Sequence, residues 1–189
     1  MKELQGFVIR IESDYLRMLP RNEVVRDCIR EIATRTIDLF LQHITLIRVS
    51  EDGGAKKPSN KSKKQPQANT LRIRLASDFA QLEKCVCTLG EQAGELGKAY
   101  RVLRAFKPLL FKHFNEIAKS PALGELIPHS LIIQHLISWF APLELQLPHI
   151  QRNWSISRYA KWYDQHPDEE DRLLIIKYVY ETLLNNHFW

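Results

Sequence analysis

Apolar residues recur at helical spacing along most of the chain, and this pattern predicts an all-α protein. The first stripe comprises Leu4, Phe7, Val8, Ile11, Tyr15 and Met18, and it ends at Pro20, which a helix interior does not accommodate. Two neighbouring stripes then run side by side between residues 22 and 49, with Ile37 in one and His43 in the other. We interpret them as one broad apolar face that contacts more than one helix, with His43 as a buried, hydrogen-bonded core histidine.

The most regular pattern advances in alternating steps of four and three residues, which is typical of a left-handed contact between helices. This heptad stripe comprises Leu75, Phe79, Leu82, Val86, Leu89, Ala93, Leu96, Tyr100 and Leu103. A continuous helix over 71–106 would be about 54 Å long and would project as a rod. Gly90, Gly94 and Gly97 weaken such a helix, so a bend at these residues is the alternative.

Further helices are predicted after Pro108, over 129–140, after Ser155 as an N-cap, and after Pro167. The acidic run 168–171 is interpreted as stabilising the positive start of its own helix. We therefore expect an all-α fold that forms an elongated antiparallel helical bundle or rod of about six to seven helices. The chain is expected to form a single helical domain over residues 1–189.

Residues 50–69 differ in composition and are predicted to form a mobile basic loop. They contain two Gly, two Pro and no large apolar residue, and their five lysines are Lys56, Lys57, Lys61, Lys63 and Lys64. With two acidic residues the loop carries +3 of the net charge of +5, which leaves +2 for the rest of the chain. The loop is a candidate contact for an anionic surface, and the alternative function is a basic helical module that binds anionic lipid or nucleic acid.

No pattern of catalytic, cofactor-binding or metal-ligating residues is found, so an enzyme is not predicted. Cys85 and Cys87 are two residues apart on a predicted helix, which places their side chains about 200° apart. The three glycines that precede Lys98 lack the spacing and the Ser or Thr of a phosphate-binding loop. Three cysteines among 189 residues do not form a disulfide framework, which favours a reducing compartment.

A membrane span is also not predicted. The longest segment without a charged residue, 126–143, contains Pro128 and Pro142. The residues between the prolines would form about 20 Å of helix, against about 30 Å of bilayer core. The first residues resemble no secretory signal, and no capping residue precedes the first helix, so we expect a part of a longer protein.

Several longer blocks resemble one family. They are Met1–Phe7, ASDFAQLE at 76–83, LGKAYRVLRAFKPLLF at 96–111, SPALGELIPHSLIIQ at 120–134, and the stretch from Gln151 to Ile175. In this order they resemble the C-terminal part of subunit five of the conserved oligomeric Golgi complex. The resemblance covers most of the chain outside 50–69 and the last dozen residues. Compared with that family, the chain has a lysine-rich insert and an altered C-terminus, Tyr178–Trp189.

The resemblance implies a non-enzymatic subunit that tethers vesicles in intra-Golgi retrograde transport, without cofactors. It implies a cytoplasmic protein, peripheral on the cytosolic face of the Golgi membrane, that contacts the membrane indirectly and binds no nucleic acid. The implied partners are other subunits of the complex, above all subunit seven. The candidate partner interface comprises Leu75, Phe79, Leu82, Val86, Leu89, Leu96, Tyr100 and Leu103, and the apolar helix 129–140 is a second candidate. Either surface can instead be buried within the chain.

Overall fold

The computed structural model describes residues 2–20, 22–47, 67–89, 96–113, 116–117, 120–140, 148–174 and 176–177. Every regular element within these ranges is a helix, which confirms the all-α fold class. By its internal contacts the chain divides into two compact units. Unit 1 comprises Met1–Leu39 and Asn69–Phe111, and unit 2 comprises Phe40–Ala68 and Lys112–Trp189. The expected single domain over 1–189 stays a prediction.

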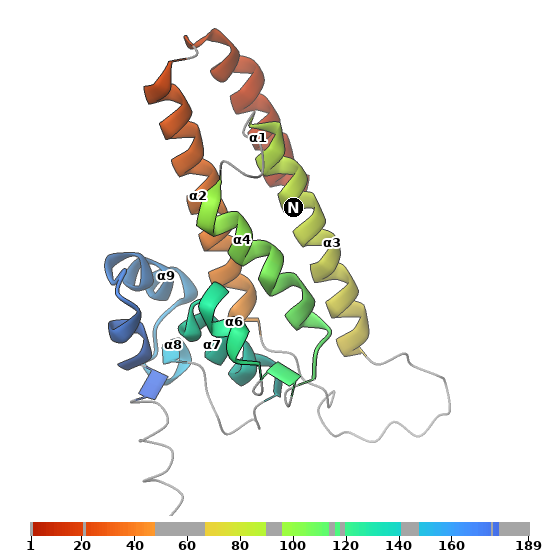
Figure 1. Cartoon of the computed structure of the whole chain (residues 1–189), viewed down its shortest axis with the longest axis vertical. Coiled ribbons are helices and arrows are strands. Elements are labelled where there is room, and N and C mark those ends of the chain that lie inside the picture. The colour runs from red at the N-terminus through yellow and green to blue at the C-terminus, as the bar shows by residue number, and fades with distance from the viewer. Residues whose placement is uncertain are drawn as a thin grey trace, which may run out of the picture. The chain divides into compact units, whose positions relative to one another are not determined.

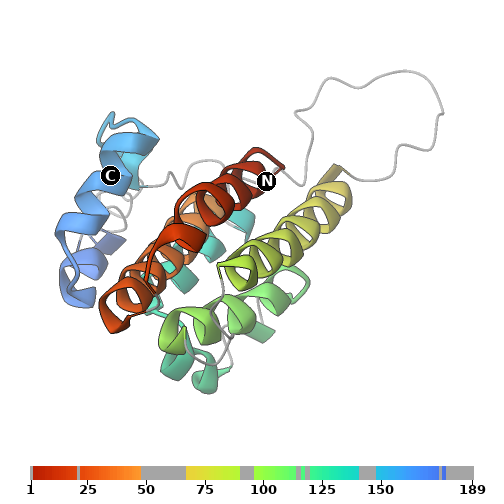
Figure 2. The ribbon, with the colours of Figure 1, turned by 90° about the horizontal axis from the view of Figure 1, so that it is seen from above.

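Unit 1 is an antiparallel bundle. Its elements are α1 (Lys2–Asp14), the 3₁₀ turn η1 (Leu16–Met18), the first part of α2 (Glu23–Thr45), α3 (Gln67–Thr88), α4 (Gly97–Phe106) and the 3₁₀ turn η2 (Lys107–Leu110). Figures 1 and 2 show the helices α1, α2, α3 and α4 side by side, with successive helices running in opposite directions. This arrangement lets short apolar stripes on four helices bury one another.

The core of unit 1 lies mainly between α3 and α4. The rings of Phe79 on α3 and Phe106 on α4 stack with their centroids 6.3 Å apart, and both side chains are fully buried. At the edge of this contact Lys107 Nζ lies 3.5 Å from Glu83 Oε2. The other buried apolar residues of unit 1 are Val8, Ala33, Ile37, Leu75, Leu82, Cys85, Val86, Leu89, Leu96, Ala99, Val102, Leu103, Leu109 and Leu110.

Only one of the two stripes predicted on α2 faces the interior. Buried residues recur at Ala33, Ile37, Leu41 and Ile44, which is the spacing of a single helical face. His43 is exposed, so its interpretation as a buried core histidine is wrong. The reason is geometric: His43 lies six residues beyond Ile37 and therefore about 120° away around the helix.

The heptad stripe is divided between two helices, so the prediction of one continuous helix over 71–106 is wrong. Helix α3 ends at Thr88 and α4 begins at Gly97, while residues 90–95 lie outside the described ranges. Gly97 has a φ of 56°, in the left-handed region that residues with a Cβ rarely adopt. Helices α3 and α4 run in opposite directions, so the chain reverses between Thr88 and Gly97 (Figure 1).

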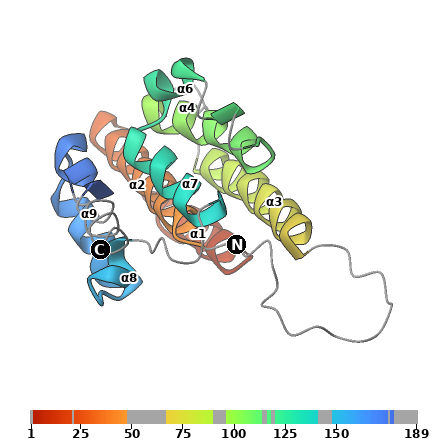
Figure 3. The same cartoon turned by 90° about the horizontal axis from the view of Figure 1, so that it is seen from below.

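Unit 2 is built around α7 (His129–Phe140). The last turns of α2, then α6 (Pro121–Leu126), α8 (Pro148–Gln151) and α9 (Ile156–Gln165) belong to the same unit, and residues 169–174 and 176–177 are also helical (Figure 3). Ser155 is the N-cap of α9, as predicted, because its Oγ accepts a hydrogen bond of 3.2 Å from the N–H of Arg158. The buried apolar residues of unit 2 include Leu41, Ile44, Leu46, Ile117, Ile127, Leu131, Ile137, Trp139, Tyr159, Tyr163 and Ile176.

The charge-free segment forms α7, as predicted, together with the α6–α7 connection. Among the described residues, no helix has both the length and the apolar character that a membrane crossing requires.

Two glycine substitutions are predicted to have opposite effects on stability. Gly97→Ala has room for the added Cβ but must keep a positive φ, so it should lower the free energy of unfolding by about 1–2 kcal/mol. Gly6→Ala lies within α1, also with room for a Cβ, and should raise it by about 0.5–1 kcal/mol. Urea unfolding followed by circular dichroism measures both. Equal effects of the two substitutions would contradict the role assigned to Gly97.

Candidate partner-binding surfaces

The predicted interface stripe faces the inside of unit 1. Leu75, Phe79, Leu82, Val86, Leu89, Leu96 and Leu103 are all buried, and Tyr100 is half-buried. The helices of unit 1 therefore already cover seven of these eight side chains, which is the alternative that the sequence left open. A contact of this stripe with another protein stays a prediction, and it would require unit 1 to open. Substitutions such as Leu82→Asp would place an unpaired charge in the core and would test folding rather than binding.

Several predicted features lie outside the described residues. They are the lysines Lys56, Lys57, Lys61, Lys63 and Lys64, the C-terminal segment Tyr178–Trp189, Ala93 of the heptad stripe, and the glycines Gly90 and Gly94. The basic loop lies outside the described ranges as far as residue 66, and α3 begins at Gln67, before the predicted end of the loop.

The turn between α1 and α2 exposes several large apolar side chains, and we call it the hairpin tip. It comprises Tyr15, Met18, Leu19 and Val24, and the exposed fractions of Tyr15, Met18 and Val24 are 66%, 83% and 68%. Asn22 fixes the return of the chain, since its Oδ1 accepts a hydrogen bond of 2.9 Å from the N–H of Val25 in the first turn of α2. Single exposed apolar residues are common, but a cluster within ten residues marks a candidate interaction surface.

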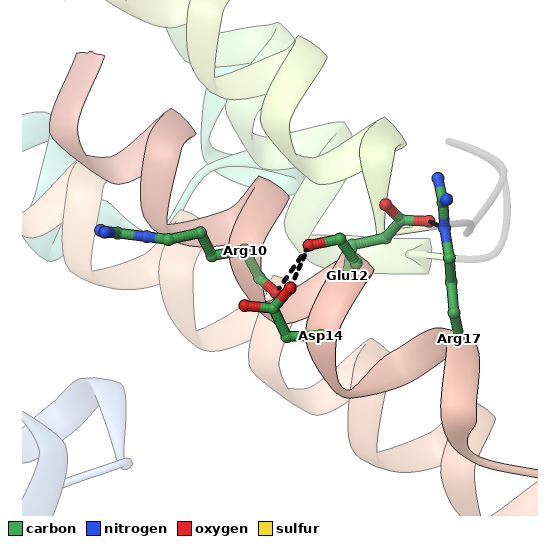
Figure 4. A network of polar contacts seen from close by, with 5 residues as sticks. Arg10, Glu12, Asp14 and Arg17 are labelled. Carbon is green, nitrogen blue, oxygen red and sulfur yellow. Dashed lines mark hydrogen bonds and ion pairs between the residues drawn. The ribbon is translucent and has the colours of Figure 1, made fainter.

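Polar groups at the end of α1 border the hairpin tip (Figure 4). Arg17 Nε donates a hydrogen bond of 3.0 Å to Glu12 Oε1, and the Ser13 hydroxyl lies 2.7 Å from Asp14 Oδ1. The Arg17 side chain is largely exposed, so this ion pair contributes at most about 1 kcal/mol to stability. An apolar centre with a polar rim is the usual composition of a protein–protein interface.

In unit 2, α7 is tied to the helical residues after Pro167 by a carboxylate. Glu169 accepts hydrogen bonds from the backbone N–H of Ser130 and, at 3.0 Å, from the Ser130 hydroxyl. The Tyr163 hydroxyl of α9 lies 2.9 Å from the same Ser130 oxygen. Glu169 thus caps the N-terminal turn of α7, where a negative charge is favourable. The acidic run was predicted to serve its own helix, and the structure shows one of its residues serving another.

A second set of buried polar contacts links α7 to α9 and to the end of α2. The Gln134 side-chain amide donates to the Tyr159 hydroxyl, and the Thr45 hydroxyl lies 3.0 Å from Gln134 Oε1. Burial, followed by the neighbouring Tyr163, raises the pKa of Tyr159 well above its ordinary value, so its hydroxyl stays neutral. Buried polar groups that are paired in this way favour one arrangement of the helices over others.

Arg172 holds the end of α9. Its side-chain nitrogens donate hydrogen bonds of 2.7 Å to the His166 carbonyl and 3.0 Å to the Tyr163 carbonyl. Its guanidinium carbon also lies 3.6 Å from the centre of the Tyr163 ring. A cation at the C-terminal carbonyls of a helix is favourable, so Arg172 fixes the turn between α9 and the residues that follow.

His149 is a buried histidine of unit 2 with a perturbed pKa. Its side chain is buried, its ring lies 5.7 Å from that of Tyr159, and its Nδ1 has no hydrogen-bond partner within the described part of the chain. Burial lowers the pKa of His149 below its ordinary value, because the charged form would lose its hydration.

The described residues contain no group of three or more His, Cys, Asp or Glu residues that could hold a metal ion. Cys85 is buried and Cys87 exposed, as their predicted opposite orientation required, and burial raises the pKa of the Cys85 thiol. These surfaces present exposed apolar and charged side chains, through which proteins commonly recognise one another.

Three known proteins are similar to this chain over most of its length. A mouse relative is 40% identical over 98% of this chain, a Drosophila melanogaster relative 31% identical over 98%, and an Arabidopsis thaliana relative 27% identical over 90%. All three are named conserved oligomeric Golgi complex subunit 5. The resemblance is confirmed. No family model matches the chain, and no solved structure matches it significantly.

The chain spans about a fifth of the length of these subunit 5 relatives, with matches to 20%, 22% and 19% of them. This agrees with the expectation that it corresponds to a part of a longer subunit. The matched range reaches 98% of the chain and so extends further than expected, into the last dozen residues. The lysine-rich insert and the altered C-terminus stay predictions.

Removal of the Ser130 hydroxyl is predicted to destabilise unit 2. Ser130→Ala removes the hydrogen bonds that the Ser130 hydroxyl makes with the Tyr163 hydroxyl and with one oxygen of Glu169, which should lower the free energy of unfolding by about 1–3 kcal/mol. Ser157→Ala on the exposed side of α9 is the matched control and should change it by less than about 0.5 kcal/mol. Thermal or urea unfolding compares the two, and equal losses would contradict the role of Ser130.

Acidification is predicted to weaken the fold through His149. Because the unfolded chain binds a proton at this residue more readily than the folded one, stability is complete above the unfolded pKa of 6.5 and decreases below it. The slope from this one proton is at most about 1.4 kcal/mol per pH unit. His149→Gln should reduce the slope of stability against pH between pH values of about 6.5 and 5. An unchanged slope in the folded variant would show that His149 does not carry the effect.

Proposed function

We propose that this chain is a non-enzymatic assembly module of the conserved oligomeric Golgi complex that takes part in tethering vesicles during intra-Golgi retrograde transport. The name shared by its relatives supports the membership, and the all-α fold supplies long surfaces suited to helix–helix contacts. A tether gathers its partners and raises their effective concentration, which requires binding surfaces and no catalytic group. The observation that carries the proposal is the 40% identity to the mouse subunit over nearly the whole chain.

The partner that we propose is subunit seven of the same complex, within a larger assembly of its subunits. We place the module on the cytosolic face of the Golgi membrane as a peripheral protein that reaches the membrane through the assembly. Since the heptad stripe is buried, we propose the hairpin tip as the surface that contacts the partner. Met18 and Val24 are its most exposed apolar side chains, and their burial against a partner would give the largest gain in apolar contact.

Co-expression with subunit seven, followed by size-exclusion chromatography with light scattering, tests this proposal. A stoichiometric complex is expected, and the double substitution Met18→Asp with Val24→Asp should weaken it by at least about tenfold, equivalent to about 1.4 kcal/mol. Ile73→Asp on α3 is the control, because Ile73 is 65% exposed and lies outside the hairpin tip.

Three results would separate the parts of this proposal. A folded chain that forms no complex with subunit seven would refute the proposed partner. A complex that tolerates both tip substitutions would refute the proposed surface while keeping the partner. Equal weakening by Ile73→Asp would show a general effect of added negative charge rather than a contact at the hairpin tip.

A further inference from the structure

Unit 2 has an apolar groove beside α7, the helix that the sequence offered as a second candidate interface. The groove has a volume of about 550 Å³ and is lined by Ile133 of α7 and by Leu173, Leu174 and Ile176 of the helical residues after Pro167. Glu170 and Lys177 complete its lining. Its volume lies within the usual range for binding pockets, of about 300–1,000 Å³.

The two sides of the groove are α7 and the helical residues after Pro167, and buried contacts hold them together. Ile176 forms a small buried cluster with Ile137 of α7, and Ile133 packs against this cluster. At one end of the groove, the hydrogen bonds from Ser130 to Glu169 hold the start of the helical residues after Pro167 against α7. The groove is therefore formed in the chain before any ligand binds, which reduces the entropy cost of binding.

The spacing of the lining residues fits a helix better than a small polar molecule. Glu170, Leu173, Leu174 and Lys177 are spaced at i, i+3, i+4 and i+7, so they share one helical face. An apolar face of this kind beside another helix binds a third helix through residues at the same spacing. Leu174 lines the groove with 61% of its surface exposed, so an incoming apolar side chain would cover it.

The charges at one end of the groove favour a partner that carries the opposite charge there. Glu170 lines the groove at this end, and Lys177 lies seven residues further on along the same side. Glu170 and its neighbours in the chain, Asp168 and Asp171, are all exposed, whereas the neighbouring Arg172 bonds the carbonyls at the end of α9 and contacts the Tyr163 ring. The surface at this end is therefore acidic. Opposite charge across an interface speeds association and excludes partners with charge of the same sign.

We propose that this groove binds a basic amphipathic helix of a partner protein. Such a helix carries leucine-like residues at i, i+3 or i+4, and i+7, and carries Lys or Arg at the end that lies over Asp168, Glu170 and Asp171. The inference rests on the proposed assembly function and gives it a second docking surface, in the other unit from the hairpin tip. The protein that would bind the groove is specified only by its apolar spacing and its basic charge.

A synthetic peptide tests this proposal without any other subunit. The probe is a fluorescent helical peptide of about 18 residues with leucines at the spacing above and lysines at its other positions, titrated with the full chain by anisotropy. We expect saturable binding that Leu174→Glu weakens at least tenfold, and a matched peptide with Glu in place of every Lys should bind at least tenfold more weakly. Ile156→Glu, at an exposed isoleucine of unit 2 outside the groove, is the control and should change affinity less than twofold. Circular dichroism establishes that both variants are folded.

Several results would overturn the proposal. Absence of binding to the folded chain, or equal affinity for the basic and acidic peptides, would refute the basic helix. Displacement of the peptide by decanoic acid below its micellar concentration, with tighter binding of the acid, would reassign the groove to a small apolar ligand. Sedimentation that shows self-association lost in Leu174→Glu would reassign it to a second copy of the chain. The co-expression test does not depend on these outcomes, so failure of the groove is distinguishable from failure of the proposed function.

Discussion

The organisation of unit 2 depends on one carboxylate, that of Glu169 at the N-terminus of α7. It accepts hydrogen bonds from Ser130, which lies 39 residues earlier in the chain, and the Tyr163 hydroxyl meets the same serine oxygen. A buried N–H at a helix start costs free energy when it has no partner, and Glu169 removes that cost while it fixes where the following helical residues lie. The groove between those residues and α7 is a consequence of this contact.

The two units are stabilised by different interactions, and this decides what remains for other proteins. In unit 1 most side chains of the heptad stripe are buried by packing between α3 and α4, as the stacked rings of Phe79 and Phe106 show. Four of the large apolar side chains left on the outside of that unit lie close together at the turn between α1 and α2, and the others are spread over its helices. Unit 2 instead combines a small apolar core with paired polar groups such as Gln134 and Thr45. Both arrangements leave apolar surface of the kind that an assembly subunit of the Golgi complex would use.

Local patterns in the sequence predicted the longer helices, because helical period and capping act over a few residues. Ser155 as the N-cap of α9 followed from such a pattern. Directly after Pro108 the chain forms the 3₁₀ turn η2 rather than the expected α-helix, and the short helices α6 and α8 were not predicted. The residues of the heptad stripe are the same whether it lies on one straight helix or on two antiparallel helices. The positive φ of Gly97, where the second helix begins, is seen only in the folded backbone. The role of Glu169 was missed because its partner Ser130 lies 39 residues earlier in the chain. The exposure of His43 was missed because tertiary packing decides which face of α2 is covered. The resemblance predicted the family but no binding residue, since exposure is set by tertiary packing.

Hydrogen exchange followed by mass spectrometry, with and without subunit seven, tests whether the heptad stripe is closed within unit 1 and whether the partner contacts the hairpin tip. We expect slow exchange over 75–88 and 97–106 in the free chain, and added protection at 15–24 when the partner binds. Fast exchange over the stripe in the free chain, with protection there and none at 15–24 on binding, would contradict this expectation.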